Sequence, residues 1–202
     1  MIERGSATAD EMVLAFLQAE VDSPRYRDYY AVALTKIGAA RATLIDNADL
    51  QDARQNAARS LILGAFRGYG QNRVLFAGFP IETSWRKVSV TPAEIGHFKY
   101  AKHRIWSALT GGTRLVADGA RNLDIVQTDE NTRLHVRAVA DRLAQGDRFP
   151  PLIAVQSTGA DDIVLMEGHT RATAYALTGI PDEFTVLIGS SPDMSVRWST
   201  WW

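Results

Sequence analysis

Residues 163–179 read IVLMEGHTRATAYALTG, and this stretch decides the fold. It opens with a continuous apolar run, typical of a buried strand, and a helical pattern over 172–177 follows almost directly. Gly179 ends the predicted helix, because glycine readily adopts the left-handed conformation of a C-terminal cap. The sequence therefore predicts a strand and a helix joined by the polar, glycine-containing turn 167–171.

The turn 167–171 has the composition of an anion site. The first N–H groups of a helix have no partner inside it, and the helix dipole adds positive charge there. Gly168 permits close approach, Thr170 adds a hydroxyl, and Arg171 can hold phosphate by two hydrogen bonds. Together with His169 these are the candidate phosphate- and nucleotide-binding residues. Glu167 and His169 are the candidate catalytic residues; Glu167 could act as general base, Mg²⁺ ligand, or partner of Arg171 or His169.

Further strands surround this turn in the sequence. Residues 151–155 form a second apolar run, and a loop of turn residues separates it from the run at 163–166, which predicts a hairpin. Residues 184–188 predict a third strand, and the alternation around Val88 and Val90 predicts a short fourth one. Together with the helices described next, they indicate an α+β protein with a small mixed sheet.

The first third of the chain predicts helices. Thr8 and Glu11 have capping-box spacing, and Ser23 followed by proline is a second start signal. A third helix is expected over about 48–66, with a face that should pack against a partner: Leu50, Ala53, Ala57, Leu61 and Ala65. Residues 67–80 then break the pattern with glycines; 67–73 lack the full spacing of a phosphate loop and are interpreted as a connector. We therefore predict a helical N-terminal extension, 1–80, and a second domain, 81–202.

The middle of the chain also predicts helices. Thr91 begins a second capping box, and the apolar pattern after it predicts one helix that stops at Gly111, with His97 and Arg104 on a solvated face. Two more helices are expected at 113–123 and 132–143. The terminal tryptophans should dock into the chain's own core, with a dimer contact as the alternative: Trp198, Trp201 and Trp202.

Composition excludes several classes of function. The chain has no cysteine, which removes disulfides, thiolate metal sites and cysteine nucleophiles, and its histidines lack metalloprotease spacing, so no metal site is expected. A net charge of −1 gives no global attraction for a polyanion, so nucleic acid is not an expected partner. No segment has the length of a membrane span or the pattern of a signal peptide, which predicts a cytoplasmic protein without a membrane partner.

The motif order resembles the ParB/sulfiredoxin-like superfamily. A glycine and a proline-led strand at 146–155, a loop, an apolar strand, the box 167–171 and a helix match its pattern, in which a Gly-His/Glu-x-Arg box lies at the same junction. The resemblance covers about 85–188 and implies a ParB/sulfiredoxin-like core in the second domain. In that superfamily the box faces nucleotide phosphates: CTP in partition proteins, ATP in sulfiredoxins and ADP in free-serine kinases.

Three differences from the pattern of the superfamily limit which of its branches the chain resembles. Sulfiredoxins need a cysteine beside the glycine, and this chain has none. Partition proteins follow the box with a helix-turn-helix and a dimerisation tail, for which the remaining segment is too short. The nearest branch is the free-serine kinase type, which usually has aspartate where this chain has Glu167. Glu94 and Glu130 are candidates, by position, for the further upstream glutamate of that branch.

The resemblance implies a nucleotide-binding phosphotransferase of kinase type that acts on a small hydroxyl-bearing substrate. ATP or ADP is the expected cofactor, with CTP as an alternative and Mg²⁺ as an additional ligand. The expected partners are a nucleotide and a small-molecule substrate, and a homo-oligomer is left open. The first alternative is a non-catalytic, nucleotide-responsive protein-interaction module, so enzyme or binder is undecided at this point. A nucleic-acid-modifying enzyme ranks below both.

Overall fold

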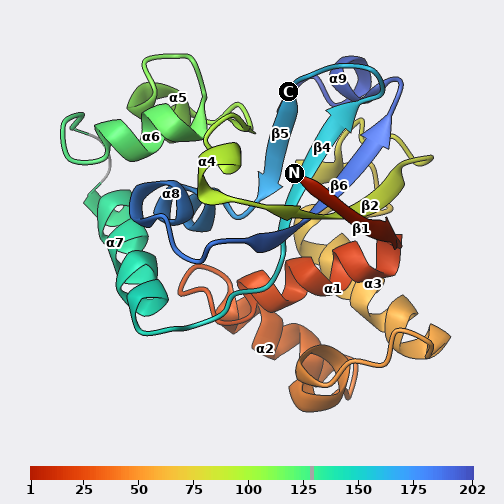
Figure 1. Cartoon of the computed structure of the whole chain (residues 1–202). Helices are drawn as coiled ribbons and strands as arrows, with labels where there is room; N and C mark the ends of the chain where they lie inside the picture. Colours follow the sequence, from red (N-terminus) through yellow and green to blue (C-terminus); the bar gives the residue numbers. More distant parts are fainter. Residues whose placement is uncertain (128–129) are drawn as a thin grey trace.

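A computed structural model describes residues 1–127 and 130–202, and its centre is a mixed sheet of six strands (Figure 1). The strand order is β1-β2-β6-β4-β5-β3. The pairs β4–β6 and β3–β5 are parallel and the others antiparallel. The α+β class and the hairpin β4–β5 are thereby confirmed. The strands are β1 Ile2–Ala7, β2 Ser84–Val90, β3 Lys99–Tyr100, β4 Leu152–Ser157, β5 Ile163–Glu167 and β6 Phe184–Ser191.

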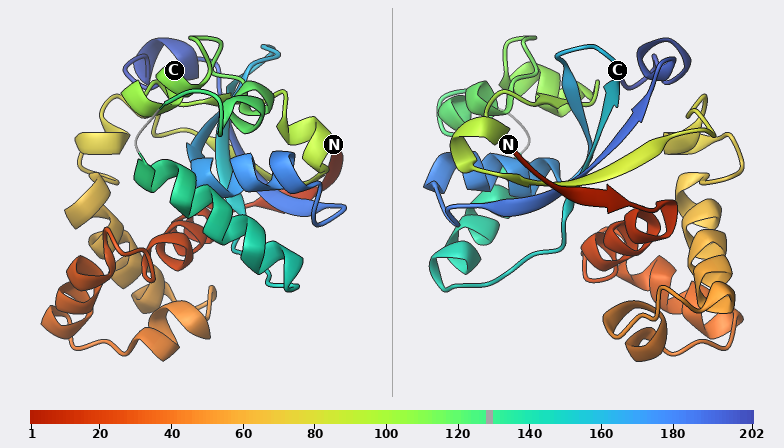
Figure 2. Two further views of the ribbon diagram at one scale, coloured as in Figure 1. Left: turned by 90° about the vertical axis from the view of Figure 1, so that its left-hand side faces the viewer. Right: turned by 45° about the vertical axis from the view of Figure 1, so that its right-hand side comes forward.

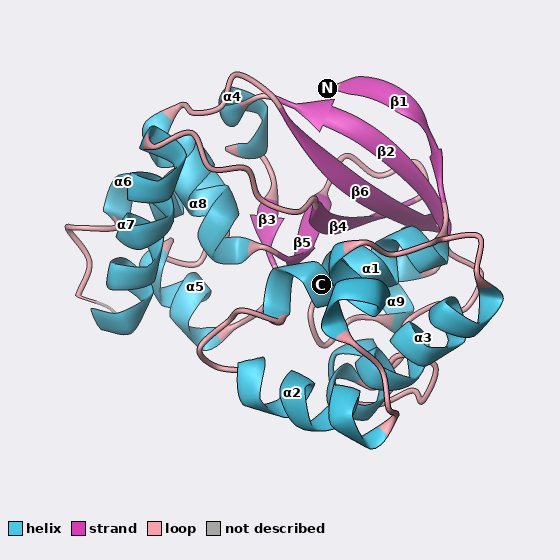
Figure 3. Cartoon of the chain, turned by 90° about the horizontal axis from the view of Figure 1, so that it is seen from below, coloured by secondary structure: helices cyan, strands magenta, loops and turns pink. Residues whose placement is uncertain are grey.

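Helices cover both faces of this sheet, in groups that lie apart from one another (Figures 2 and 3). One group packs with Ile153, Val155 and Val164, and the other with the alternate residues Ala154 and Leu165, as the pleat requires. The first group comprises α1 Ala9–Glu20, α2 Arg27–Lys36, the π-helix η1 Ala42–Asp46, α3 Ala53–Arg67, the 3₁₀ turn η2 Val74–Phe76 and α9 Met194–Arg197. The second comprises α4 Pro92–Ile95, α5 Arg104–Leu109, α6 Val116–Asn122, α7 Glu130–Ala144 and α8 His169–Thr178.

Local signals in the sequence located several helix ends correctly. Both predicted capping boxes form, at Thr8 with Glu11 and at Thr91 with Glu94. Gly179 ends α8 in the left-handed conformation, as predicted. The helices expected at 113–123 and 132–143 correspond to α6 and α7. The second helix begins later than expected, at Arg27, and follows a turn in which the carbonyl of Ser23 accepts the N–H groups of Tyr26 and Arg27.

The prediction of one helix from Thr91 to Gly111 is wrong. The chain leaves α4 at Gly96, and the segment β3 adds to the edge of the sheet, where Lys99 pairs in parallel with Val164. Sheet hydrogen bonds therefore replace the middle of the expected helix, and α5 begins only at Arg104. As a result His97 and Arg104 do not share a helix face.

The predicted apolar face of the third helix is also wrong. The helix starts at Ala53, capped by the Asp52 carboxylate, and Leu61 is 64% exposed. The buried side carries Arg59, whose guanidinium donates to the carbonyl of Leu44 (3.0 Å) and to that of Asp49 (2.9 Å). The predicted face consists mostly of alanines and is weakly apolar, and α3 instead buries the larger apolar side chains of Ile62 and Leu63 together with Arg59.

The N-terminal third contributes to the sheet as well as covering it. The unpredicted strand β1 pairs antiparallel with β2, with an irregularity at Gly5, and α1 packs against β4. The division at residue 80 stays a prediction. Residues 67–73 connect α3 to η2, and Arg73 donates to the carbonyl of Ala65 near the end of α3.

The C-terminal segment docks on the first helix group. Trp198 is fully buried, and its indole N–H donates to the carbonyl of Leu75 (2.7 Å). Trp201 and Trp202 pack, partly buried, against the same cluster. This agrees with the expectation of docking into the chain's own core. Within residues 1–127 and 130–202, no helix has the length and apolar character needed to cross a bilayer.

Candidate functional site: the junction of β5 and α8

The turn between β5 and α8 depends on a glycine. Gly168 has φ +97°, a conformation that L side chains rarely adopt, and it is the cap residue before α8. A Cβ at this position would lie 2.3 Å from Cδ2 of Leu152, so a larger residue does not fit without movement. Glycine at this point therefore permits both the sharp turn and the close approach to β4.

The start of α8 leaves backbone donors free. The first backbone bond of the helix runs from the N–H of Ala172 to the carbonyl of Gly168 (2.8 Å). The N–H groups of the preceding residues, His169, Thr170 and Arg171, have no acceptor in the described part of the chain. His169 and Thr170 are only partly buried. The predicted set of helix N–H donors is thus present and unpaired.

Arg171 is engaged within the protein. It is 7% exposed, its Nη2 donates to the carboxylate of Glu167, and its Nη1 donates to the carbonyl of Pro150. These bonds hold the start of α8 to the segment that enters β4. Of the roles considered for Glu167, the structure shows the partner of Arg171, and Arg171 would have to leave this carboxylate to hold a phosphate by both nitrogens.

Glu167 lies in a charged environment that extends into the first helix group. Burial raises the pKa of this carboxyl group, and the charge of Arg171 opposes that shift. The charges of Glu20 in α1 and Arg67 in α3 also act on it. Glu20 is itself buried; it accepts a hydrogen bond from the hydroxyl of Tyr30 (2.7 Å) and pairs with Arg67.

His169 is held in an aromatic stack. Its ring lies parallel to Tyr100 and Trp106, each with centroids 5.6 Å away. Nε2 accepts the N–H of Ala101 (3.2 Å), so we assign the ring proton to Nδ1. Burial, with a smaller effect of the charge on His103, lowers the pKa of His169 to about 3. At neutral pH the imidazole is therefore an uncharged hydrogen-bond donor and not a cation.

Exposed basic residues lie between Tyr100 and Trp106, two members of this stack, in the sequence. Lys102 and Arg104 flank His103, and all three side chains are exposed. Burial lowers the pKa of His103, and the positive charges of Arg25 and Arg104 lower it further, which places these cations close together. No carboxylate of the described residues pairs with Lys102 or Arg104. Two arginines, Arg25 and Arg104, thus lie close to His103, and the charge of His103 acts on His169 at the junction.

The two other candidate glutamates have structural roles. Glu94 completes the capping box of α4 and pairs with the amino group of Met1. Glu130 is exposed at the start of α7, 3.8 Å from Arg133. The carboxylate that does act on Glu167 is Glu20, which we had not singled out. Its signal is its position three residues after Leu17, on the apolar side of α1, where an unpaired acid would be costly.

Comparisons with known proteins identify no relative: no family model, no curated protein and no solved structure matches the chain. The resemblance to the ParB/sulfiredoxin-like superfamily therefore stays a prediction. Within the described ranges, no cluster of three or more His, Asp or Glu side chains could hold a metal ion. For Mg²⁺ the junction offers Glu167, and that carboxylate is paired with Arg171. The residues of the junction alone do not fit a magnesium site.

Proposed function

We propose that this protein binds the phosphates of a nucleotide at the start of α8. The observation that carries the proposal is the set of unpaired N–H groups of His169, Thr170 and Arg171 at the beginning of a ten-residue helix. Successive free amides at a helix start, assisted by the helix dipole, are a recurrent phosphate-binding arrangement. The Nδ1–H of His169 adds a neutral donor, and the exposed Arg104 lies close to His103, whose charge acts on His169. ATP or ADP is the first expected ligand and CTP the second.

We propose further that binding is the primary activity and that the protein acts as a nucleotide-responsive module. Glu167 is paired with Arg171, and Glu20 with Arg67 and Tyr30, so each carboxylate near the junction already has a partner. A general base has to be free to accept a proton. The ordered pairs therefore favour the binder over the enzyme.

Phosphoryl transfer is the second candidate, and the raised pKa of Glu167 favours it. A carboxylate with a pKa nearer neutrality is a better proton acceptor at physiological pH. In this reaction Glu167, released from Arg171, would take the proton of a substrate hydroxyl. The oxygen would form a bond to the γ-phosphorus of ATP, the bond from that phosphorus to the bridging oxygen would break, and ADP would leave.

Titration calorimetry with ATP, ADP and CTP, using matched variants of Thr170, tests the binding site. Thr170→Asp places a negative charge in the first turn, which favours the helix dipole but repels phosphate. Thr170→Asn introduces a side chain of nearly the same shape as aspartate but without its charge. We expect Thr170→Asp to weaken binding by roughly tenfold or more while Thr170→Asn retains it. Absence of binding by the wild-type chain at millimolar nucleotide, or equal affinity of the two variants, would overturn the proposal.

Phosphorus NMR of the protein with ATP and a panel of small alcohols, hydroxy amino acids among them, separates the two candidates. Product formed by the wild type and abolished in Glu167→Gln, with nucleotide binding retained, would establish the phosphotransferase. Glutamine can still accept the hydrogen bond of Arg171, so the junction should stay folded. Nucleotide that binds and remains unchanged over days would establish the binding module.

A further inference from the structure

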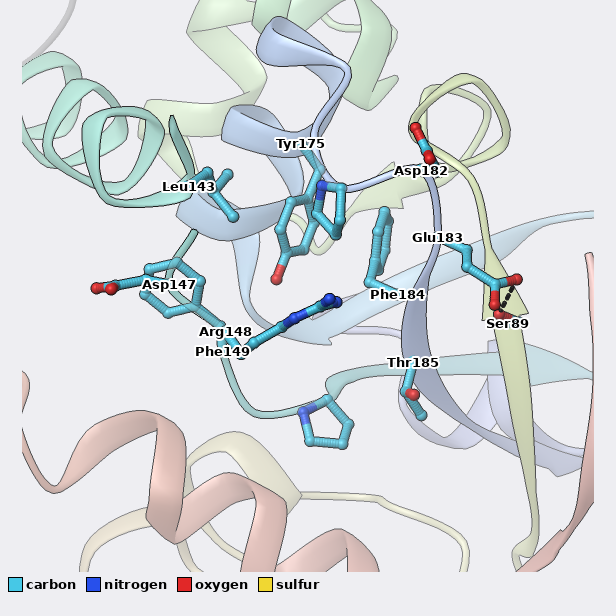
Figure 4. A pocket seen from close by; sticks show the side chains of 12 residues that line it. Ser89, Leu143, Asp147, Arg148, Phe149, Tyr175, Asp182, Glu183, Phe184 and Thr185 are labelled. Atoms are coloured by element: carbon cyan, nitrogen blue, oxygen red, sulfur yellow. Dashed lines mark hydrogen bonds between the residues drawn. The ribbon is translucent and has the colours of Figure 1, made fainter. Parts of the chain in front are cut away.

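A cavity of about 500 Å³ lies beside the C-terminal half of α8 (Figure 4). Its size is within the range of small-molecule sites. The rings of Tyr175 and Phe184 stack there, with centroids 4.0 Å apart and planes inclined by 24°. The remaining apolar walls come from Leu143, Phe149, Pro151 and Pro181. The cavity therefore offers flat, apolar surfaces that fit an aromatic ring.

Tyr175 brings a free hydroxyl into this cavity. The residue is 3% exposed, and Figure 4 shows its oxygen directed between Phe149 and the Arg148 side chain. No group in the described part of the chain forms a hydrogen bond with this hydroxyl. Among the described residues, this oxygen is not one of the buried polar atoms that lack a partner, so solvent reaches it through the cavity. A ligand acceptor can therefore replace water at the hydroxyl.

Arg148 brings an unpaired positive charge to the same place. Arg148 is exposed, and its side chain extends beneath the rings of Tyr175 and Phe184 in Figure 4. Burial raises the pKa of Tyr175, and the charges of Arg171 and, less strongly, Arg148 oppose that shift. No acid of the described residues pairs with it. The adjacent Asp147 forms an ion pair with Arg142 instead (2.6 Å).

The acidic side chains that line the cavity limit the negative charge that a ligand can carry. Glu183 accepts from Ser89 (2.7 Å) and pairs with Arg4 (3.1 Å), and Asp182 lies at the rim. With Asp147 these are three acids around one unpaired arginine. A doubly charged phosphate ester would meet more repulsion here than a singly charged carboxylate. A planar carboxylate also matches the fork of a guanidinium.

We propose that this cavity binds a small aromatic carboxylate, with its carboxylate held by Arg148 and the Tyr175 hydroxyl and its ring against Phe149 and Phe184. The site does not depend on the nucleotide site proposed above. The two regions are connected through the box, because Arg171 donates to the carbonyl of Pro150, between two residues that line the cavity, and the charges of Arg171 and Glu167 act on Tyr175.

Ligand-observed NMR and calorimetry on the full chain test this site with phenylacetate, phenylacetamide and phenyl phosphate. We expect phenylacetate to bind with a dissociation constant on the order of 1 mM or below. The neutral amide and the phosphate ester should bind roughly tenfold more weakly, since the first leaves Arg148 unmatched and the second meets the surrounding acids.

Matched variants decide whether the binding belongs to the cavity. Arg148→Gln and Tyr175→Phe should each weaken phenylacetate binding several-fold or more, and Tyr175→Phe should leave the melting temperature unchanged. Arg133→Gln removes an exposed arginine from α7 and should have no effect, nor should Thr170→Asp, which tests the nucleotide site. No phenylacetate binding at about 10 mM, equal binding of the amide, tighter binding of phenyl phosphate, or unchanged affinity in both cavity variants would overturn the proposal.

Discussion

The two ends of α8 differ in which of their polar groups remain free. At the N-terminal end the side chains are paired, Arg171 with Glu167 and His169 with the N–H of Ala101, and the backbone donors are free. Beside the C-terminal half the backbone is capped, while the Tyr175 hydroxyl and Arg148 are unpaired. A motif indicates where polar groups gather. The pairing in the folded chain determines which of them a ligand can use.

The largest expected effect comes from removing the central pair at the N-terminal end. Arg171→Met leaves Glu167 buried without its partner and releases the carbonyl of Pro150. Loss of one partner of a buried ion pair typically costs about 3–5 kcal/mol, which urea denaturation would measure. Arg133→Gln, which removes an exposed arginine, should change the free energy of unfolding by no more than about 0.5 kcal/mol. Similar stabilities of the two variants would contradict a structural role for Arg171.

The same variant predicts a pH dependence. Burial raises the pKa of Glu167, so the folded state of Arg171→Met should bind a proton there more tightly than the unfolded state does. Its destabilisation relative to the wild type should therefore shrink as the pH falls through the raised pKa of this carboxyl group. Urea denaturation at several pH values measures this, and a difference that grows on acidification would contradict it.

Alanine substitutions at the two glycines that cap α8 allow its two ends to be compared directly. Both have positive φ, +97° at Gly168 and +71° at Gly179, but an added Cβ would clash with Leu152 only at Gly168. Gly179→Ala should cost about 1–2 kcal/mol for the left-handed conformation alone. Gly168→Ala should cost about 1–3 kcal/mol more, because the core must also shift. Equal melting temperatures for the two variants would show that the close approach at Gly168 is unimportant.

The lowered pKa of His169 predicts a smaller effect on the stability of the fold, and this effect depends on pH. Its pKa of about 3 lies below that of an unfolded histidine, so the unfolded state gains a proton first and the folded state loses stability as the pH falls below about 6.5. Between pH 7 and pH 5 this contributes roughly 1–2 kcal/mol of destabilisation. His169→Gln, which can still accept the N–H of Ala101, should lack that contribution. Imidazole NMR signals of His169 that titrate near pH 6.5 would contradict the buried, neutral state.

The smallest effect is expected where a hydroxyl has no partner in the protein. Tyr175→Phe should change the free energy of unfolding by no more than about 0.5 kcal/mol. Tyr30→Phe is the matched control, because the hydroxyl of Tyr30 donates to the buried carboxylate of Glu20, and it should cost about 1.5–3 kcal/mol. A large loss in Tyr175→Phe would show that its hydroxyl stabilises the fold instead of serving a ligand.

The parts of the fold that local signals specify were predictable. The apolar runs of β4 and β5, both capping boxes and the Gly179 cap depend on neighbouring residues, and the structure confirms them. Lys99 and Tyr100 show the limit of this reasoning. The apolar residues around them have helical spacing, but pairing with β5, more than sixty residues later in the chain, places Lys99 and Tyr100 in a strand.

The residue types of the candidate site were predictable from the sequence, but their hydrogen-bond partners were not. The sequence indicated Gly168 at a strand-to-helix turn, and its positive φ agrees with that interpretation. It gave no sign that Arg171 would bond the carbonyl of Pro150, since a backbone acceptor is not specified by any side chain. Tyr100 and Trp106 lie within the single helix predicted from Thr91 to Gly111, and their stack on His169 forms because β3 and α5 meet the start of α8.

The stack at Trp106 gives the protein an internal optical reporter. Its indole lies half-buried against the His169 ring, beside the amides at the start of α8, whereas Trp198 is sealed in the opposite core. Emission from Trp106 should therefore respond to an anion that arrives at the junction, and emission from Trp198 only to global unfolding. The chain has five tryptophans, so the difference in emission between the wild type and a Trp106→Tyr variant would isolate the signal of Trp106 and allow occupancy to be followed in real time without a label.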